Sequence, residues 1–123
     1  MILGIGVDIV KTARFEGMTP PFMARVFTPE ERAYFASKGH ISAAGFFSAK
    51  EAVAKALGTG FSGFWPDQIE VVHDKQGRPG IILHKEAAGI AQRLAGSEAK
   101  YHIDISISHT DTDAIAFAII SCC

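Results

Sequence analysis

Residues 46–60, which read FFSAKEAVAKALGTG, are the stretch around which the other predicted elements can be arranged. Apolar side chains recur there every three or four residues, which predicts an amphipathic helix that buries Phe46, Ala49, Val53, Ala56 and Leu57. A second face at the same spacing carries the polar residues Ser48, Glu51, Lys55 and Thr59. Gly58 and Gly60 then end the helix, because glycine readily adopts the left-handed conformation of a helix C-terminus.

The polar face of this predicted helix has two interpretations. On a surface helix, Glu51 and Lys55 form an ion pair that contributes about 0.2–0.5 kcal/mol. In a functional site, the same face offers a carboxylate, an ammonium group and hydroxyls from one rigid element, beside a flexible glycine turn. The rest of the chain has to decide between the two.

Length and composition predict a single domain over residues 1–123, or a subunit that another copy completes. Hydrophobic residues make up 48% of the chain and charged residues 20%, which is typical of a globular protein. The net charge of −1 argues against non-specific nucleic-acid binding. No apolar run approaches the roughly 18–20 residues of a membrane helix, so we expect neither a nucleic-acid nor a membrane partner.

The cysteines and the N-terminus favour a reducing, cytoplasmic location. Cys122 and Cys123 are adjacent, so they can neither staple the fold nor offer the spacing of metal ligands. The apolar residues 1–10 lack a preceding basic segment and a small-residue cleavage site, which argues against a signal peptide.

The first strand, predicted over residues 2–10, presents a carboxylate among glycines. We expect its buried face to consist of Leu3, Ile5, Val7 and Ile9. The other face carries Gly4, Gly6 and Asp8, and glycine in a strand often marks a close approach by a ligand or another backbone. Asp8 is either a local capping residue or the floor of a site.

Residues 11–39 combine short helices with basic side chains. Thr28, Pro29 and Glu31 form a capping-box helix start, and Gly39 stops that helix. Arg14 and Arg25 lie in a locally basic region, which is either a solvated surface or a docking surface for an acidic partner.

The remaining segments predict an α+β fold, with an antiparallel sheet packed against the long central helix. A loop at 59–65 carries aromatic side chains that must pack on the core, a ligand or another subunit: Phe61, Phe64 and Trp65. Residues 69–73 and 81–83 form a hairpin, and residues 84–95 form a helix. Isoleucines alternate with polar residues at 103–108, and small alanines alternate with large apolar residues at 114–120. The alanine face suits close packing against a helix.

Three polar groups then stand out: Asp8, the pair of Glu51 and Lys55, and the segment SISH at residues 106–109. Each signal is weak by itself, and a histidine at a strand end is commonly structural. Together they offer two carboxylates, an ammonium group, hydroxyls and an imidazole. Two carboxylates without cysteine suit Mg²⁺, which commonly completes its coordination with substrate phosphates. This combination indicates a phosphoryl- or diphosphate-handling site, although no Walker loop or dinucleotide fingerprint occurs.

Three segments together resemble the signatures of the short 4′-phosphopantetheinyl transferases. They are GIGVDIV at residues 4–10, FSAKEAVAKALGTG at residues 47–60 and SISH at residues 106–109. The match follows the family's order and covers almost the whole chain. The resemblance implies an enzyme that transfers 4′-phosphopantetheine from coenzyme A to a serine of an apo acyl carrier protein, and releases adenosine 3′,5′-bisphosphate.

The resemblance also implies roles for catalytic residues. Asp8 and Glu51 match the family's Mg²⁺ ligands, and Lys55 matches the last lysine of its K-E-x-x-x-K motif, beside the diphosphate. Glu51 is the candidate general base for the carrier serine, directly or through a metal-bound water, and Lys55 neutralises the leaving side.

Further matching positions concern coenzyme A and the protein partners. Gly58 and Gly60 match a glycine turn near the nucleotide, and Ser108 and His109 match the end of the motif that contacts coenzyme A. Two basic residues match a docking surface for the acidic carrier protein: Arg14 and, less closely, Arg25. The resemblance implies a homotrimer with active sites between subunits.

One position departs from the family pattern. Many members carry arginine where this chain has Phe46, five residues before Glu51. An arginine there can contact the nucleotide, whereas Phe46 supplies no charge. We expect Lys50, Arg78 or a neighbouring subunit to provide part of the phosphate contacts, or the affinity for coenzyme A to be lower.

Two other functions fit parts of the sequence. One is a non-catalytic module that binds a carrier protein or a nucleotide, and the other is a different Mg²⁺-dependent diphosphate enzyme, such as a nucleotide hydrolase. The presence of Asp8, Glu51 and Lys55 together favours the transferase.

Overall fold

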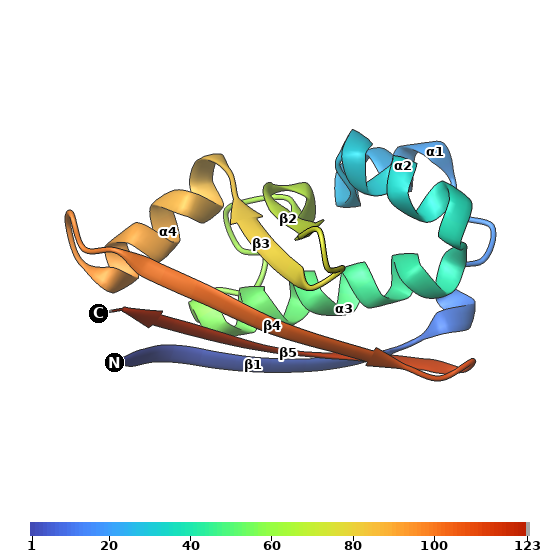
Figure 1. The fold of residues 1–123 in the computed structure, drawn as a ribbon. Coiled ribbons are helices and arrows are strands. Elements are labelled where there is room, and N and C mark those ends of the chain that lie inside the picture. The colour runs from blue at the N-terminus through green and yellow to red at the C-terminus, as the bar shows by residue number, and fades with distance from the viewer. Residues whose placement is uncertain (123) are drawn as a thin grey trace.

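A computed structural model describes residues 1–122 as a long helix lying on a three-stranded antiparallel sheet (Figure 1). The helix is α3 (His40–Leu57), and the strands are β1 (Ile2–Lys11), β4 (Tyr101–His109) and β5 (Asp113–Cys122). β5 lies in the middle, in the order β1-β5-β4. The predicted α+β fold, with an antiparallel sheet against the central helix, is therefore confirmed. Cys123, the second of the adjacent cysteines, lies outside the described residues.

η1 (Thr12–Phe15) follows β1 beside the start of α3, and the remaining elements cover the side of α3 that faces away from the sheet (Figure 1). The first group consists of α1 (Pro20–Val26) and α2 (Pro29–Lys38). The second consists of η2 (Pro66–Gln68), an antiparallel hairpin of β2 (Ile69–His73) and β3 (Pro79–Leu83), and α4 (Lys85–Ala95). Within residues 1–122 no helix is long and apolar enough to cross a membrane.

β1 and α3 approach each other more closely than side chains would allow. A Cβ atom on Gly6 would lie 1.9 Å from the carbonyl oxygen of Ala52, and one on Gly4 would lie 2.0 Å from that of Ala56. The central strand β5 continues this surface with three buried small residues, Ala114, Ala116 and Ala118. The small-residue face of the sheet is thus the one that packs against the helix.

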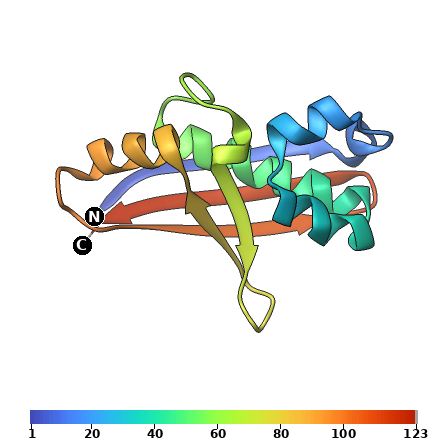
Figure 2. The ribbon, with the colours of Figure 1, turned by 90° about the horizontal axis from the view of Figure 1, so that it is seen from above.

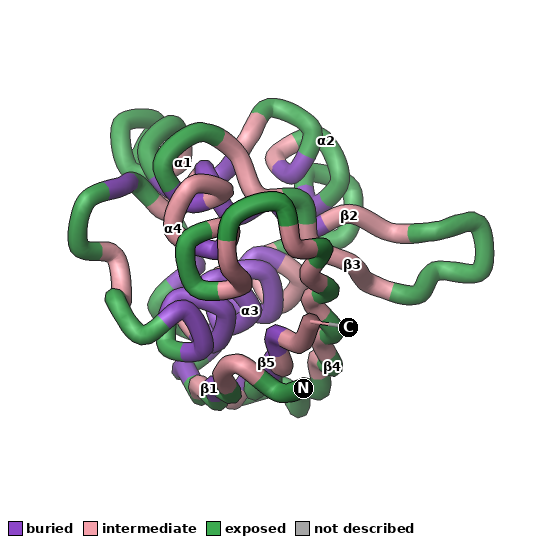
Figure 3. The backbone as a smooth tube through the Cα atoms, turned by 90° about the vertical axis from the view of Figure 1, so that its left-hand side faces the viewer, coloured by how far each residue is buried: buried purple, intermediate pink, exposed green. Residues whose placement is uncertain are grey.

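The predicted buried face of β1 is therefore wrong. Ile5, Val7 and Ile9 are 60%, 50% and 63% exposed, because they point away from α3 to the outer side of the sheet. Ile115 and Phe117 of β5 are exposed on the same outer face, since the register places Phe117 opposite Val7 and Ile115 opposite Ile9. Figure 3 shows the burial concentrated on α3, with β1 exposed along part of its length.

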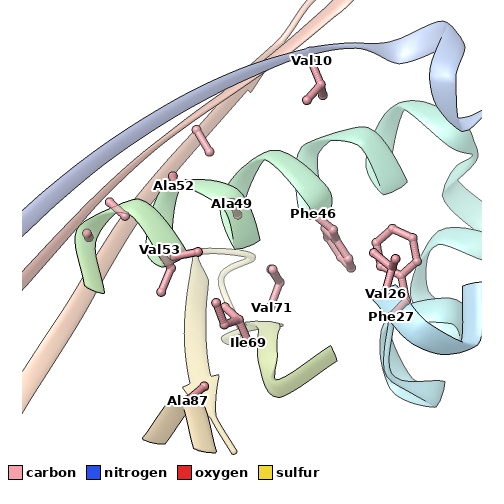
Figure 4. Close-up of a cluster of buried hydrophobic side chains, with 14 of the residues drawn as sticks. Val10, Val26, Phe27, Phe46, Ala49, Ala52, Val53, Ile69, Val71 and Ala87 are labelled. Carbon is pink, nitrogen blue, oxygen red and sulfur yellow. The ribbon is translucent and has the colours of Figure 1, made fainter. Parts of the chain in front are cut away.

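Local signals in the sequence fix the helix ends as predicted. Thr28 and Glu31 form the capping box of α2, with each side chain accepting a hydrogen bond from the other residue's backbone N–H, at 3.1 and 2.8 Å. Gly58 ends α3 in the left-handed conformation at a φ of 86°. A core lies on the side of α3 that faces away from the sheet, where Val53, Ile69 and other apolar side chains meet (Figure 4).

We expect Gly6→Ala to destabilise the protein by about 3 kcal/mol or more, because the new methyl group collides with a backbone carbonyl that cannot rotate away. Chemical denaturation measures this change. Gly80→Ala is the control, because its Cβ would meet only Val72 Cγ2 at an ordinary 3.7 Å. Equal stability of the two variants would contradict the close β1–α3 approach.

Candidate active site

Asp8, Glu51 and Lys55 meet between the end of β1 and the second half of α3, and we call this group the carboxylate site. Lys55 Nζ lies 3.1 Å from Asp8 Oδ1 and donates a second hydrogen bond to the carbonyl oxygen of Val7 at 3.0 Å. Glu51 precedes Lys55 by about one helical turn, on the same face of α3. The structure thus brings together the three residues that the sequence analysis singled out.

The backbone beneath Asp8 is held in place by α3. Ser48 is fully buried, and its hydroxyl donates a hydrogen bond to the carbonyl oxygen of Asp8 at 2.8 Å. The Asp8 side chain is only 14% exposed, and its Oδ2 atom has no hydrogen-bond partner among the described residues. A buried carboxylate oxygen without a partner is costly, so this atom is available to a ligand.

The electrostatics of the carboxylate site are not balanced within the chain. Burial raises the pKa of Glu51, and the negative charge of Asp8 raises it further. Lys55 and Arg14 act in the opposite direction and lower this pKa, but they do not offset the first two effects. Additional positive charge at this point would stabilise both carboxylates.

The donor set fits Mg²⁺ in kind and number. Residues 1–122 contain no group of three or more His, Cys, Asp or Glu side chains that could hold a metal ion. Mg²⁺ does not need one, because it commonly binds through one or two carboxylates together with waters and substrate phosphates. An unpartnered oxygen on Asp8 and the repelled carboxylate of Glu51 meet that description.

Gly58 and Gly60 form a turn directly beyond Lys55. Both have positive φ values, 86° and 58°. The N–H of Gly58 bonds to the Lys55 carbonyl at 3.0 Å, and that of Gly60 bonds to the Ala54 carbonyl at 3.1 Å. The predicted glycine turn therefore lies at the same end of α3 as the carboxylate site.

Ser108 and His109 are not part of the carboxylate site within one chain. The strand register places them on β4, with β5 between them and Asp8 on β1, so that about 10 Å of sheet separates the two outer strands. Ser108 also points to the outer face of the sheet, since its register partner is the exposed Ile115.

His109 instead lines a cavity of about 200 Å³ beside the first half of α3, and we call it the aromatic cavity. Tyr34 and His73 stack there with ring centroids 4.5 Å apart and planes 3° from parallel. Phe46 lies against both rings, at 5.2 and 5.7 Å, and is only 4% exposed. At the position where many family members carry arginine, this chain therefore has a buried ring in an aromatic cluster.

Of the residues expected to replace that arginine, Lys50 is excluded. It is fully buried, and its ammonium group pairs with Glu31 at 2.8 Å and donates hydrogen bonds to the carbonyl oxygens of Pro66 and Ile69. Arg78 lies at the hairpin turn and lines a separate cavity with residues 103–107 of β4.

The two predicted docking arginines occupy different surroundings. Arg14 lies close enough to Glu51 to lower its pKa, and its guanidinium covers the rings of Phe15 and Phe47 at 5.8 and 5.6 Å. Arg25, in the last turn of α1, covers the ring of Trp65 at 5.5 Å.

Sequence reasoning missed Tyr34, His73 and the proximity of Arg14 to Glu51. No local pattern could have identified the two rings, because Tyr34 belongs to α2 and His73 to the hairpin, and only tertiary packing stacks them.

Comparisons with known proteins agree with this fold. The profile of the 4′-phosphopantetheinyl transferase superfamily matches residues 4–106. The chain therefore belongs to the 4′-phosphopantetheinyl transferase superfamily. It is 41% identical over 125 residues to the holo-[acyl-carrier-protein] synthase of Clostridium perfringens strain 13, with 98% of this chain and 94% of the relative covered. These matches confirm the predicted resemblance to the 4′-phosphopantetheinyl transferases, and the relatives are holo-(acyl-carrier-protein) synthases.

Solved structures show the same architecture. The holo-[acyl-carrier-protein] synthase of Neisseria meningitidis superposes with a TM-score of 0.84 and is 31% identical, with 98% of this chain and 99% of that chain covered. The Helicobacter pylori enzyme, solved in complex with coenzyme A, gives a TM-score of 0.79 at 32% identity and covers 95% and 99% of the two chains.

The stacked His73 makes stability depend on pH. Burial lowers the pKa of His73 below its ordinary 6.5, the charge of Lys38 lowers it further, and Asp74 acts against them. Below pH 6.5 the unfolded chain therefore binds a proton that the folded chain does not. We expect this group's contribution to the free energy of unfolding to be fully present above pH 6.5 and to fall as the pH drops toward the folded pKa.

The measurement is an NMR titration of the His73 ring, with the free energy of unfolding of His73→Gln followed over the same pH range. The variant should show a smaller loss of stability on acidification than the unmodified protein. A folded His73 that titrates at or above pH 6.5 would contradict the burial seen in the aromatic cavity.

Proposed function

We propose that this chain transfers 4′-phosphopantetheine from coenzyme A to a serine of an apo acyl carrier protein, as a Mg²⁺-dependent holo-(acyl-carrier-protein) synthase. The observation that carries the proposal is the carboxylate site. There Asp8 Oδ2 has no hydrogen-bond partner among the described residues, and the positive charges nearby do not offset the effects that raise the pKa of Glu51. Membership of the family and the coenzyme A complex of the Helicobacter pylori relative support it. The cytoplasmic location stays a prediction.

Asp8 and Glu51 would hold the Mg²⁺ ion. When bound, the ion supplies positive charge that neutralises the diphosphate of coenzyme A and stabilises the charge that develops during transfer. Lys55 adds a second positive charge at the same place, since its side chain is half exposed and its ammonium group lies beside Asp8.

The transfer step forms one bond and breaks one. The serine Oγ attacks the phosphorus attached to pantetheine, and the bond from that phosphorus to the bridging oxygen breaks. The electron pair leaves with adenosine 3′,5′-bisphosphate, whose new charge Lys55 offsets. Glu51, which faces Asp8, accepts the serine proton either directly or through a water molecule.

We propose the aromatic cavity for the nucleotide end of coenzyme A. His109 lines this cavity together with the rings of Tyr34, Phe46 and His73, which offer a flat apolar surface to a base. The aromatic cavity lies beside the first half of α3, and the carboxylate site lies beside the second half. One coenzyme A molecule could therefore contact the aromatic cavity of one chain and the carboxylate site of another.

The outer face of the sheet supports the homotrimer that the family resemblance implies. This face, defined by Ile5, Val7, Ile9, Ile115 and Phe117, is an apolar surface that a monomer rarely leaves in water. Ser108 lies on the same face, so association would bring it to the boundary between copies. An active site completed between copies accounts for the separation of Ser108 and His109 from Asp8.

The deciding experiment is an incubation of the protein with coenzyme A, Mg²⁺ and an apo carrier protein, followed by intact-mass analysis. We expect the carrier to gain one phosphopantetheine group. Glu51→Gln should lower turnover at least about 100-fold, because general-base catalysis alone contributes about 10²–10⁴-fold and the variant also loses a metal ligand. Circular dichroism should show that the variant folds.

Glu98→Gln is a matched control, since Glu98 lies in the turn between α4 and β4, outside the carboxylate site. Near-normal turnover of Glu51→Gln would overturn the assignment of Glu51. Absence of transfer by the unmodified protein, with several carriers tried, would overturn the proposed function itself.

Association through the outer face has its own test. We expect Phe117→Lys to convert a particle of three chains into single chains, because a lysine in an apolar interface must lose its hydration. Size-exclusion chromatography with light scattering measures the mass. Ile82→Lys, on the exposed side of the hairpin, should leave the mass unchanged. Phe117→Lys that keeps the unmodified mass would show that this face is not the interface.

A further inference from the structure

Trp65 is the one aromatic residue of loop 59–65 that does not pack into the core. Phe64 is buried, and Phe61 packs against it with ring centroids 5.7 Å apart. Trp65 is 60% exposed and is the only tryptophan in the sequence. A lone exposed apolar residue needs no explanation by itself, but the surroundings of Trp65 set it apart.

Trp65 holds an arginine that has no carboxylate partner. The guanidinium of Arg25 lies over the indole ring at 5.5 Å, and within residues 1–122 Arg25 forms no ion pair. Stacking on an aromatic ring orients a guanidinium while leaving its N–H donors free for an acidic group. The ring therefore holds the Arg25 guanidinium in an orientation in which its N–H donors can bind an acidic group of a partner.

The pair lies at the far end of a surface that begins beside the carboxylate site. Arg14 is near Glu51 and stacks on Phe15, whose ring lies 6.4 Å from that of Phe22. Phe22 is 36% exposed and precedes Arg25 by three residues in α1, so the two share a face. We call Arg14, Phe22, Arg25 and Trp65 the aromatic–basic strip. Figure 2 shows α1 and loop 59–65 both toward the β1 side of α3.

The strip matches one kind of partner surface. Arg14 and Arg25 supply two cations, and the rings of Phe22 and Trp65 lie between and beyond them. This arrangement complements an amphipathic helix in which carboxylates flank an apolar stripe. A cavity of about 520 Å³ lined by Phe61, Phe64 and Trp65 offers space for an apolar side chain at its far end. Two carboxylates also border Trp65, since Glu86 lines the same cavity and Asp67 lines a second one with Trp65. We therefore expect an acidic helix to approach from the α1 side, where Arg25 lies.

We propose that Trp65 is an anchor for the apo carrier protein, binding an apolar residue of an acidic helix while it orients Arg25 toward a carboxylate of the same helix. This inference rests on the proposed function and adds a specificity-determining residue to it. Tryptophan and arginine are the residues that most often dominate the affinity of protein interfaces.

The single tryptophan provides a direct reporter. We expect the fluorescence of the unmodified protein to change intensity or wavelength on titration with a tryptophan-free apo carrier protein, and the change to saturate. It should weaken as salt rises, because the contact includes a charge pair. Titration with coenzyme A alone should produce a smaller change.

Kinetics test the contribution of the anchor. Trp65→Ala should raise the KM for the carrier protein about tenfold, as expected for loss of an interface hot spot, with the KM for coenzyme A within about twofold. Arg25→Ala should also raise the KM for the carrier. The double variant should lose less than the product of the two effects, because Arg25 without the ring is no longer oriented. Leu94→Ala, an exposed apolar residue of α4, is the matched control and should behave as the unmodified protein.

The outcomes separate this inference from the proposed function. If the unmodified protein modifies the carrier but Trp65→Ala has an unchanged KM and the fluorescence does not respond, the anchor is wrong and the transferase stands. If Trp65→Ala changes the particle mass instead of the KM, the occupant is a second copy and the inference is also overturned. If no transfer occurs at all, saturable fluorescence with the carrier still supports the anchor as a binding surface.

Discussion

The contact between the glycines of β1 and the carbonyl groups of α3 is the constraint on which the structure depends. Any side chain at Gly4 or Gly6 would overlap a backbone oxygen, so the strand reaches the helix without intervening atoms. Only this approach brings Asp8 beside Lys55 and lets Ser48 bind the Asp8 carbonyl. The carboxylate site is therefore a consequence of strand–helix packing.

The same contact explains why large apolar residues face outward. A strand pressed against a helix through glycine and alanine has its larger side chains on the opposite face, and neighbouring β5 repeats the arrangement with Ala116 inside and Phe117 outside. One packing choice thus generates both a polar site near α3 and an apolar face that favours association. Position on that face also explains why Ser108 cannot serve the carboxylate site of its own chain.

The sequence predicted what local chemistry determines. The capping box at Thr28, the glycine end of α3 and the alternation in β5 depend on neighbouring residues, and all three are confirmed. Periodicity also separated the two faces of β1, but it does not state which face is buried, and preferring the larger residues gave the wrong answer. Asp8 and Glu51 were found because two carboxylates near a lysine suit Mg²⁺ and phosphate, and the family motifs mark the same positions. The stacking of Tyr34 on His73 was not, because it joins segments that share no local signal.

Lys50 and Glu51 are adjacent in α3, but their side chains point to different surroundings. Lys50 points to the core above the helix, where Glu31 and two carbonyl oxygens bind it, while Glu51 faces Asp8. A buried pair of this kind fixes arrangement more than it adds stability, since desolvation of both ions offsets their attraction. With Lys50 committed to the core and Phe46 buried among rings, the positive charge this chain offers near its carboxylates comes from Lys55 and Arg14. Under the proposed function, phosphate recognition would therefore depend on those two residues and on a neighbouring copy, because Phe46 supplies no charge.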